Sequence, residues 1–336
     1  MEKKFGLYLV TFCFFVTMTM ILTTLSGANA QPKEINLALD WMVNGTHAPY
    51  YLAADKGFYK NAGLKVEIVR GYGSGDTVKK VAAKHANFGI CDFATLVASV
   101  IREKTPVKAV GVVYGKAMLG ILYLKESGIK VPRDLEGRKL ARSASGASVN
   151  MFPAFIKANQ IDRSKISEVV VDATSFLPML LSRQVDAVLE QSIHQGRFQK
   201  AADEGGQKVT VMAMLYSDFG LETYGNVIFT HNDLIEKDPR LVKDFVQASL
   251  KGVAYTFDHP EEAVSILAKM NPQVTQERAI EEVLAMKATW TEAMLKVGLG
   301  FMTPETTKNS VDNIVAALGL EKPESINLVY NNKFVK

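Results

Sequence analysis

The sequence predicts an α/β protein of two lobes, each with a mostly parallel, doubly wound sheet, joined by a two-stranded hinge. Short β-rich runs alternate with helical patterns along most of the chain, which is typical of parallel sheets with helices on both faces. This alternation occurs as two series, separated by the turn-rich stretch 128–137. The chain has 336 residues, more than one domain usually contains.

The first series begins with apolar residues that alternate with polar or small ones from Ile35 to Leu39, which indicates a strand. Asp76 precedes apolar residues at helical spacing, so we expect it to be the N-cap of the helix over 77–84. The strands expected in this series span residues 35–39, 66–69, 88–91, 107–113 and 120–124, and the helices span 50–61, 77–84 and 94–102.

The second series leads into a helical C-terminal part, in which apolar residues form a stripe from Leu241 to Phe257. Residues 31–122 and 225–336 are expected to form lobe I, and residues 123–224 lobe II. The chain would then cross between the lobes near Leu122 and near Tyr224, and such a hinge permits closure around a ligand. The strands expected here span 139–141, 168–171, 187–189, 209–215 and 226–230, and the helices span 147–159 and 176–182.

Residues 1–30 have the pattern of a cleavable secretory signal peptide. Lys3 and Lys4 precede a long apolar run, and Ala28-Asn29-Ala30 is a small-residue cleavage site. No cysteine follows that site, so no lipid anchor is expected and the protein is placed in the periplasm. The alternative is a retained leader, which would make the chain a membrane-tethered sensor module.

Charge and motifs narrow the function classes. The net charge of +4 is spread along the chain, and there is no basic stripe of the kind that nucleic-acid binding requires. The sequence has no G-x-S-x-G, H-E-x-x-H or C-x-x-C motif, and no two histidines stand four residues apart. We therefore expect no catalytic residues, no metal site, no cofactor and no enzymatic activity.

The strongest candidate ligand site follows the first predicted strand, where Asp40, Trp41, Asn44 and His47 occur within eight residues. Open α/β sheets collect ligands at the carboxyl ends of their strands. The indole of Trp41 offers a flat face for stacking on a ring, and the polar side chains offer donors and acceptors. The alternative is that Trp41 packs in the core and His47 only orders a loop.

Two loops rich in small residues precede helices, one in each lobe. In the loop 71–76, glycines let backbone N–H groups approach a ligand, and the loop 143–148 repeats this arrangement with serines. The alternative for both loops is ordinary turn formation and helix capping. The further candidates are carboxylates at strand ends, loop residues, and tyrosines near the lobe boundary: Ser74, Gly75, Asp92, Tyr114, Ser143, Ser145, Glu190 and Tyr224.

Several segments resemble substrate-binding proteins of the thiamine-pyrimidine-precursor, sulfonate, taurine and nitrate group. The matching segments include Leu39-Asp40-Trp41, His47, Lys56-Gly57-Phe58-Tyr59, Phe88-Gly89-Ile90, Gly120 to Ile129, Asp134 to Lys139, Asp186 to Glu190 and Asp238 to Val242. The resemblance implies a type II periplasmic binding fold. It also implies a small-molecule ligand, an ABC permease in the inner membrane as partner, and a monomeric protein.

Within this group, Asp40-Trp41 with His47 and Glu190 is most similar to the pyrimidine-precursor branch. That likeness implies a small heteroaromatic ligand held by the aromatic and histidine side chains, with the glutamate accepting from its amino group. An alkanesulfonate, taurine or nitrate receptor stays open through Arg142 and the two loops. An exported pyrimidine-synthesis enzyme is the alternative of another class, although residues 219–225 lack the cysteine-rich segment of eukaryotic synthases.

Overall fold

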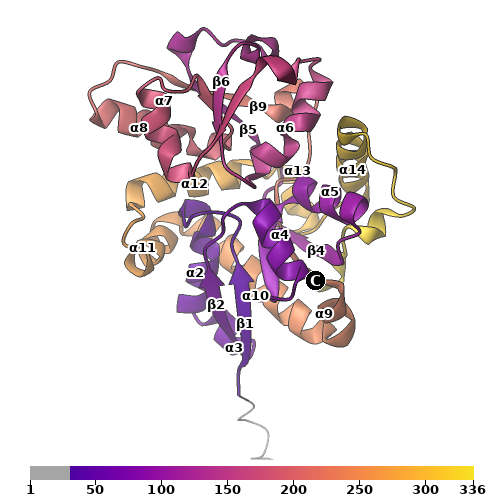
Figure 1. Ribbon diagram of the computed structural model, residues 1–336. Helices are drawn as coiled ribbons and strands as arrows, with labels where there is room; N and C mark the ends of the chain where they lie inside the picture. Colours follow the sequence, from indigo (N-terminus) through magenta and orange to yellow (C-terminus); the bar gives the residue numbers. More distant parts are fainter. Residues whose placement is uncertain (1–30) are drawn as a thin grey trace, which may run out of the picture.

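A computed structural model describes residues 31–336, so the predicted signal peptide lies outside the described residues. The chain forms two lobes, each built on a five-stranded sheet, with helices packed on the sheets and between the lobes (Figure 1). The expected two-lobe α/β architecture is confirmed. In the described part of the chain, no helix is long and apolar enough to cross a membrane.

The sheet of the first lobe has the strand order β2-β1-β3-β10-β4. Four strands run parallel, and β10, which arrives from the other lobe, runs antiparallel to both β3 and β4. Its strands are β1 (Lys33–Ala38), β2 (Leu64–Val69), β3 (Phe88–Asp92), β4 (Val107–Val112) and β10 (Asn226–His231). The central β3 is buried along its whole length, as expected for a strand covered on both faces.

The sheet of the second lobe has the order β7-β6-β8-β5-β9, and here β5 is the antiparallel strand. Its strands are β5 (Gly120–Leu124), β6 (Lys139–Arg142), β7 (Ser167–Val170), β8 (Ala187–Val188) and β9 (Val211–Leu215). Each lobe therefore has a mostly parallel sheet with one antiparallel strand, contributed by the segment that enters from the other lobe.

The helices cover the sheets and link the lobes. They are α2 (Ala48–Asp55), α3 (Phe58–Asn61), α4 (Ser74–Ala82), α5 (Phe93–Glu103), α6 (Ala147–Ala158), α7 (Phe176–Leu181), α8 (Gln195–Glu204), α9 (Asn232–Lys237), α10 (Pro239–Asp258), α11 (Pro260–Met270), α12 (Gln276–Ala288), α13 (Glu292–Val297) and α14 (Pro304–Leu318). Two short 3-10 turns matter for the site: η1 (Gly45–His47) and η6 (Ser192–His194).

Two expected helix boundaries are wrong. The helix expected over 50–61 is two helices, because Gly57 between them adopts φ +70°, a left-handed conformation that breaks an α-helix. The helix expected from residue 77 already begins at Ser74, with Gly73 as its N-cap. Asp76 therefore lies in the first turn, where it pairs with Lys80 at 2.6 Å instead of capping the helix.

The chain crosses between the sheets through residues 113–119 and 216–225. The first crossing was expected near Leu122, but Leu122 pairs with Val188 and Ala213 inside the second sheet. The expected hinge position was wrong by a few residues and falls inside β5, because that strand directly follows the crossing. Tyr224 lies at the end of the second crossing, just before β10.

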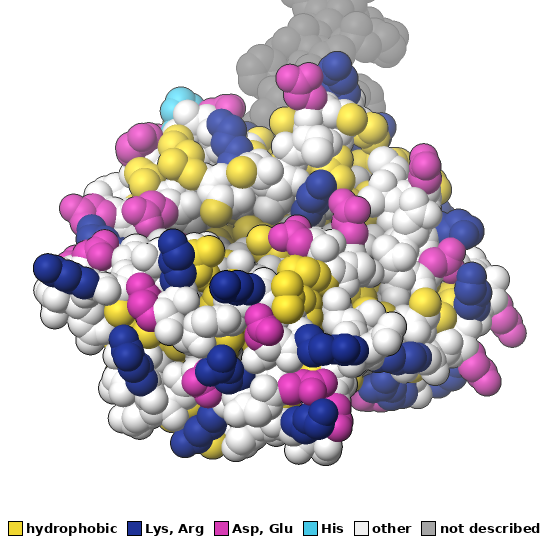
Figure 2. All heavy atoms as spheres, turned by 90° about the horizontal axis from the view of Figure 1, so that it is seen from above, with side chains coloured by type: hydrophobic (Ala, Val, Ile, Leu, Met, Phe, Trp, Pro, Cys, Tyr) yellow, Lys and Arg dark blue, Asp and Glu magenta, His cyan; other side chains and the backbone are white. Residues whose placement is uncertain are grey.

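The hydrophobic core extends over both lobes. Phe88, Phe245 and Tyr59 stack face to face in the first lobe, with ring centroids 3.8 and 5.5 Å apart. The stripe expected on α10 supplies Phe245 and is buried there. Alternate residues of β5 serve the two faces of the second sheet: Ile121 joins the main core, while Leu122 joins a smaller cluster under α7 and α8. Positive and negative side chains are interspersed over the outer face of the second lobe (Figure 2).

Candidate functional site

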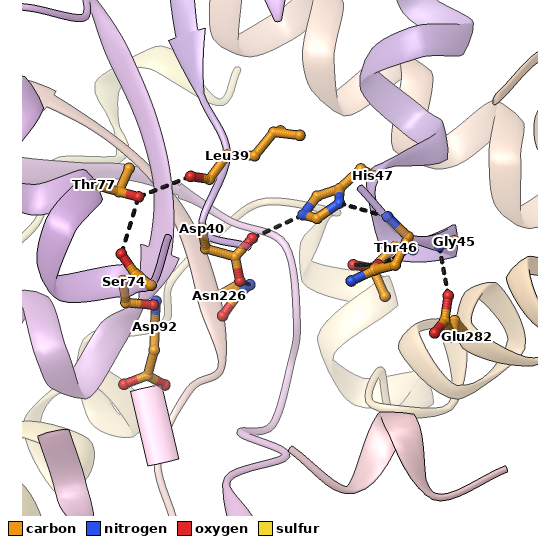
Figure 3. A network of polar contacts seen from close by, with 12 residues as sticks. Leu39, Asp40, Gly45, Thr46, His47, Ser74, Thr77, Asp92, Asn226 and Glu282 are labelled. Carbon is orange, nitrogen blue, oxygen red and sulfur yellow. Dashed lines mark hydrogen bonds and ion pairs between the residues drawn. The ribbon is translucent and has the colours of Figure 1, made fainter. Parts of the chain in front are cut away.

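Asp40 and His47 form a buried pair at the carboxyl end of β1. The Nδ1 atom of His47 accepts the backbone N–H of Asn44 at 3.2 Å, so its proton resides on Nε2, which donates to Asp40 Oδ1 at 2.8 Å (Figure 3). Asn226 of β10 donates to the other Asp40 oxygen at 2.8 Å. Because both carboxylate oxygens already accept hydrogen bonds within the first lobe, this pair orders the strand end around it.

Asn44 and Gly45 connect that strand end to α12. The Asn44 side chain caps η1 by accepting from the Thr46 N–H at 2.9 Å, and Glu282 of α12 accepts the Gly45 N–H at 2.6 Å (Figure 3). A Cβ at Gly45 would lie 2.1 Å from the Ala279 carbonyl oxygen. This position therefore requires glycine, because the backbone of η1 lies directly on α12.

Glu190 lies at the end of β8 in the second lobe and faces His194. Its Oε1 accepts the Gln191 N–H at 2.8 Å and lies 3.1 Å from His194 Nδ1, while its Oε2 is buried without a partner. Burial raises the pKa of the Glu190 carboxyl, but His194 and the Gln191 amide outweigh it and hold that pKa below its usual range. Glu190 is therefore a buried carboxylate with one free acceptor atom.

Trp41 lies at the boundary of the lobes. Its indole belongs to the first lobe but packs against the smaller core cluster of the second, and its Nε1 is buried without a partner. It lines a cavity of about 470 Å³, a volume typical of small-molecule sites, about 300–1,000 Å³. The cavity residues are Trp41, Met42, Arg70, Gly71, Tyr72 and Asp76 from the first lobe, and Ser143, Ala144, Ser145, Val170, Val171, Asp172 and Ala173 from the second.

The two loops singled out in the sequence touch each other across the lobe boundary. The Ser145 hydroxyl donates to the Tyr72 carbonyl at 3.0 Å, and the Gly75 N–H donates to the Ser145 carbonyl at 3.2 Å. Ser143 accepts the Gly146 N–H at 3.0 Å, so it orders its own loop. Ser74 accepts the Asp92 N–H at 3.0 Å. The structure therefore brings both loops together at the cavity.

Asp92, Tyr114 and Tyr224 are buried and are not among the residues that line this cavity. Asp92 caps α5 by accepting the Thr95 N–H at 3.0 Å; burial raises its pKa to about 7. Burial, and after it the nearby Asp40 carboxylate, raises the pKa of the Tyr114 hydroxyl well above its usual range. The Tyr224 hydroxyl accepts the Thr303 N–H at 3.0 Å and thereby holds the start of α14.

Only some of the twelve residues predicted to contact a ligand line this cavity. Trp41, Ser143 and Ser145 line the cavity, and Gly75 touches it through Ser145. Glu190 was expected to share a cavity with Trp41, but it is not among the residues lining this one. Asp40, Asn44 and His47 do not line it and are hydrogen-bonded to one another at the end of β1. As ligand contacts, all twelve stay predictions.

Sequence reasoning missed Arg70, Val170 and the segment 171–173, which line the cavity, and His194 with Glu282, which connect the lobes. The spacing of Glu190 and His194, four residues apart, was a usable signal. Glu282 had none, because its partner Gly45 is 237 residues away in the chain.

Residues 44–263 match the family described as NMT1/THI5 like. The chain belongs to the NMT1/THI5-like family. This match confirms the predicted resemblance. Among proteins similar to this chain, the riboflavin-binding protein RibY of Chloroflexus aurantiacus is 27% identical over 93% of this chain and 90% of that protein. A 4-amino-5-hydroxymethyl-2-methylpyrimidine phosphate synthase of Legionella pneumophila is 27% identical over 72% of this chain and 75% of the synthase.

Solved structures confirm the periplasmic binding protein fold for this NMT1/THI5-like chain. The aliphatic sulphonate-binding protein SsuA of Escherichia coli superposes with a TM-score of 0.63 at 14% identity, covering 91% of this chain and 94% of that one. The nitrate-binding protein NrtA of Synechocystis has a TM-score of 0.58 at 15% identity, over 76% of this chain and 71% of its own.

One expectation is contradicted by the relatives. The absence of catalytic motifs led us to expect no enzymatic activity, but several relatives at 22–27% identity are named pyrimidine phosphate synthases. The motifs that were sought belong to other enzyme classes, so their absence has no bearing on this chemistry.

Proposed function

We propose that this chain is the extracytoplasmic solute-binding component of an ABC import system, and that it captures a small heteroaromatic compound by closure of its two lobes. The observation that carries this proposal is the cavity of about 470 Å³ at Trp41, which is lined from both lobes. A ligand that contacts both walls favours the closed form, because its differential contacts stabilise that form.

The lining of the cavity supports a flat, partly polar ligand. Trp41 and Tyr72 offer aromatic faces, Val170 and Val171 offer apolar surface, and the unpartnered Nε1 of Trp41 offers a donor. Relatives named for riboflavin and for a pyrimidine both point to heteroaromatic compounds. Glu190 does not line this cavity; with its free Oε2 it stays a predicted acceptor for a ligand N–H.

An alkanesulfonate, taurine or nitrate is the alternative ligand class. Arg70 and the hydroxyls of Ser143 and Ser145 could bind an oxyanion at the cavity wall. The solved sulphonate-binding and nitrate-binding neighbours share this fold. Arg142 does not line the cavity and pairs with Glu168 at 2.6 Å, so Arg70 is the cation on which this alternative depends.

The leader over residues 1–30 supports export to the periplasm without a lipid anchor, and the fold supports an inner-membrane permease as partner. We propose that the exported protein is a monomer. N-terminal sequencing of the exported protein is expected to begin at Gln31; a retained leader would instead indicate a membrane-tethered module.

Native mass spectrometry and thermal-shift screening test the ligand class. Protein purified without denaturation is weighed for co-purified compounds and is then screened with riboflavin, 4-amino-5-hydroxymethyl-2-methylpyrimidine, taurine, an alkanesulfonate and nitrate. Only a bound compound raises the unfolding midpoint. A rise with the heteroaromatic compounds, together with compaction in small-angle scattering, is expected; a rise only with the anions would contradict the proposed ligand class.

Synthesis of a pyrimidine is the second candidate function, favoured by the relatives named as synthases. Mass spectrometry of the incubated, purified protein tests it. A pyrimidine product made by the wild type and absent with His47→Asn would support this second candidate.

A further inference from the structure

Helix α12 lies between the two lobes (Figure 1). Its buried residues, which include Ala279 and Val283, face the first lobe, where Gly45 of η1 lies directly on its backbone. On the side of the second lobe it meets η6 and α8. A helix fixed to one lobe and in contact with the other is positioned to resist separation of the lobes.

The buried end of this contact joins Glu282 to His194. Glu282 is 4% exposed, and its Oε2 holds the Gly45 N–H of the first lobe. Its Oε1 lies 3.9 Å from His194 Nε2 of the second lobe, and the Asn44 amide lies 3.4 Å from the same nitrogen. Glu190 lies on the other side of the ring, 3.1 Å from Nδ1. One imidazole thus stands between a carboxylate of each lobe.

The exposed end of the contact consists of two ion pairs between α8 and α12. Lys200 pairs with Glu277, and Arg278 lies 3.4 Å from Glu204. Lys200 and Glu204 lie on α8, and Glu277 and Arg278 lie on α12. Each of the four side chains therefore faces one of opposite charge on the other helix. These side chains are partly exposed, and each pair contributes modestly.

We propose that these three contacts form a closure latch that sets the balance between open and closed lobes. The latch consists of Glu282 with His194, Lys200 with Glu277, and Arg278 with Glu204. None of its six residues is among those lining the cavity at Trp41, so it acts on ligand affinity through the closed fraction. The inference rests on the proposed function, since it assumes that the lobes close around a solute.

Charge reversal at the exposed end tests the latch with little risk to folding. Lys200→Glu places two carboxylates face to face, and Lys200→Glu with Glu277→Lys restores the pair in reverse. Lys84→Glu is the matched control, because Lys84 pairs with Asp233 within the first lobe. Spin labels on cysteines at Lys60 and Gln184, both exposed and one in each lobe, report the distance between the lobes; the native Cys91 is buried.

The distance distribution is measured free and with riboflavin as probe. We expect Lys200→Glu to shift it toward longer distances and to weaken riboflavin binding about two- to tenfold. The double swap should restore both quantities, and Lys84→Glu should change neither. Glu282→Gln, which keeps an acceptor for the Gly45 N–H but loses the charge facing His194, should act in the same direction, with urea unfolding as the check on folding.

Unchanged distances in Lys200→Glu, or no recovery in the double swap, would overturn the latch. Failure of the proposed function has a different signature: riboflavin and the other compounds would then leave the wild-type distance unchanged. In that case the comparison of ligand-free Lys200→Glu with the ligand-free wild type still decides the latch.

Discussion

Ser145 of the second lobe donates its hydroxyl to the backbone carbonyl of Tyr72 in the first lobe, at 3.0 Å. The neighbouring Gly73 adopts φ +126°, and a Cβ there would lie 2.4 Å from the Ser145 carbonyl oxygen. The lobes therefore meet backbone to backbone beside the cavity, at a place where a glycine permits the approach.

Replacing Gly73 with alanine should prevent the lobes from closing fully, because the methyl group would overlap the Ser145 carbonyl. In small-angle scattering, the variant should keep a larger radius of gyration than the wild type with riboflavin present. Gly57→Ala is the matched control: Gly57 also has a positive φ, but nothing lies within 4 Å of its added Cβ. Equal compaction of both variants would contradict the prediction.

The two tryptophans of the chain should respond differently to a ligand. Trp41 lines the cavity, whereas Trp290 is buried and donates to the Val113 carbonyl at 2.8 Å. Riboflavin should therefore quench the fluorescence of the wild type and of Trp290→Phe, and much less that of Trp41→Phe. Trp41→Ala should weaken binding of a flat ring at least tenfold, through loss of stacking and buried area. Quenching retained in Trp41→Phe would place the ligand elsewhere.

Asp40→Ala should destabilise the first lobe, because it leaves two buried donors, His47 Nε2 and Asn226 Nδ2, without an acceptor. We expect the free energy of unfolding in urea to fall by roughly 2–5 kcal/mol. Asp218→Ala, at an exposed aspartate, is the control and should cost about 0.5 kcal/mol or less. If Asp40→Ala lowered the free energy of unfolding by as little as the control does, the Asp40–His47 pair would contribute little to stability.

The Asp92 carboxyl should make stability fall as pH rises. Burial raises its pKa from 3.8 to about 7 in the folded protein. Between these values the unfolded chain has released the proton while the folded protein retains it, so this group's contribution decreases as pH rises from about 4 to about 7. Asp92→Asn keeps an acceptor for the Thr95 N–H and removes the titration. Urea unfolding should find the variant increasingly more stable than the wild type from pH 4 to pH 8; a constant difference would contradict this.

Much of the fold could be predicted because its signals are local. Alternation from Ile35 to Leu39 and the stripe on α10 indicate their own secondary structure, and the order of such elements limits the sheets to a mostly parallel arrangement. The split at Gly57 and the start of α4 at Ser74 were missed because backbone conformation at glycines depends on the turn that the chain must complete. The position of the first crossing was missed because a strand pattern does not state which sheet the strand joins.

The same distinction between local signals and long-range contacts applies to the site. The residue types at the end of β1, the loops around Gly75 and Ser145, and the carboxylate of Glu190 can be read from the chain, because each follows a strand, at the edge where open α/β sheets generally collect ligands. Tyr72, His194 and Glu282 gain their roles only from neighbours supplied by other segments. The sequence by itself determined two βα series, the edge where a ligand is expected and the family, since these depend on local periodicity and short motifs. Only the tertiary structure decided that Trp41 faces the second lobe, that Asp40 and His47 satisfy each other, and that α12 bridges the lobes, because such contacts arise when segments far apart in the chain pack together.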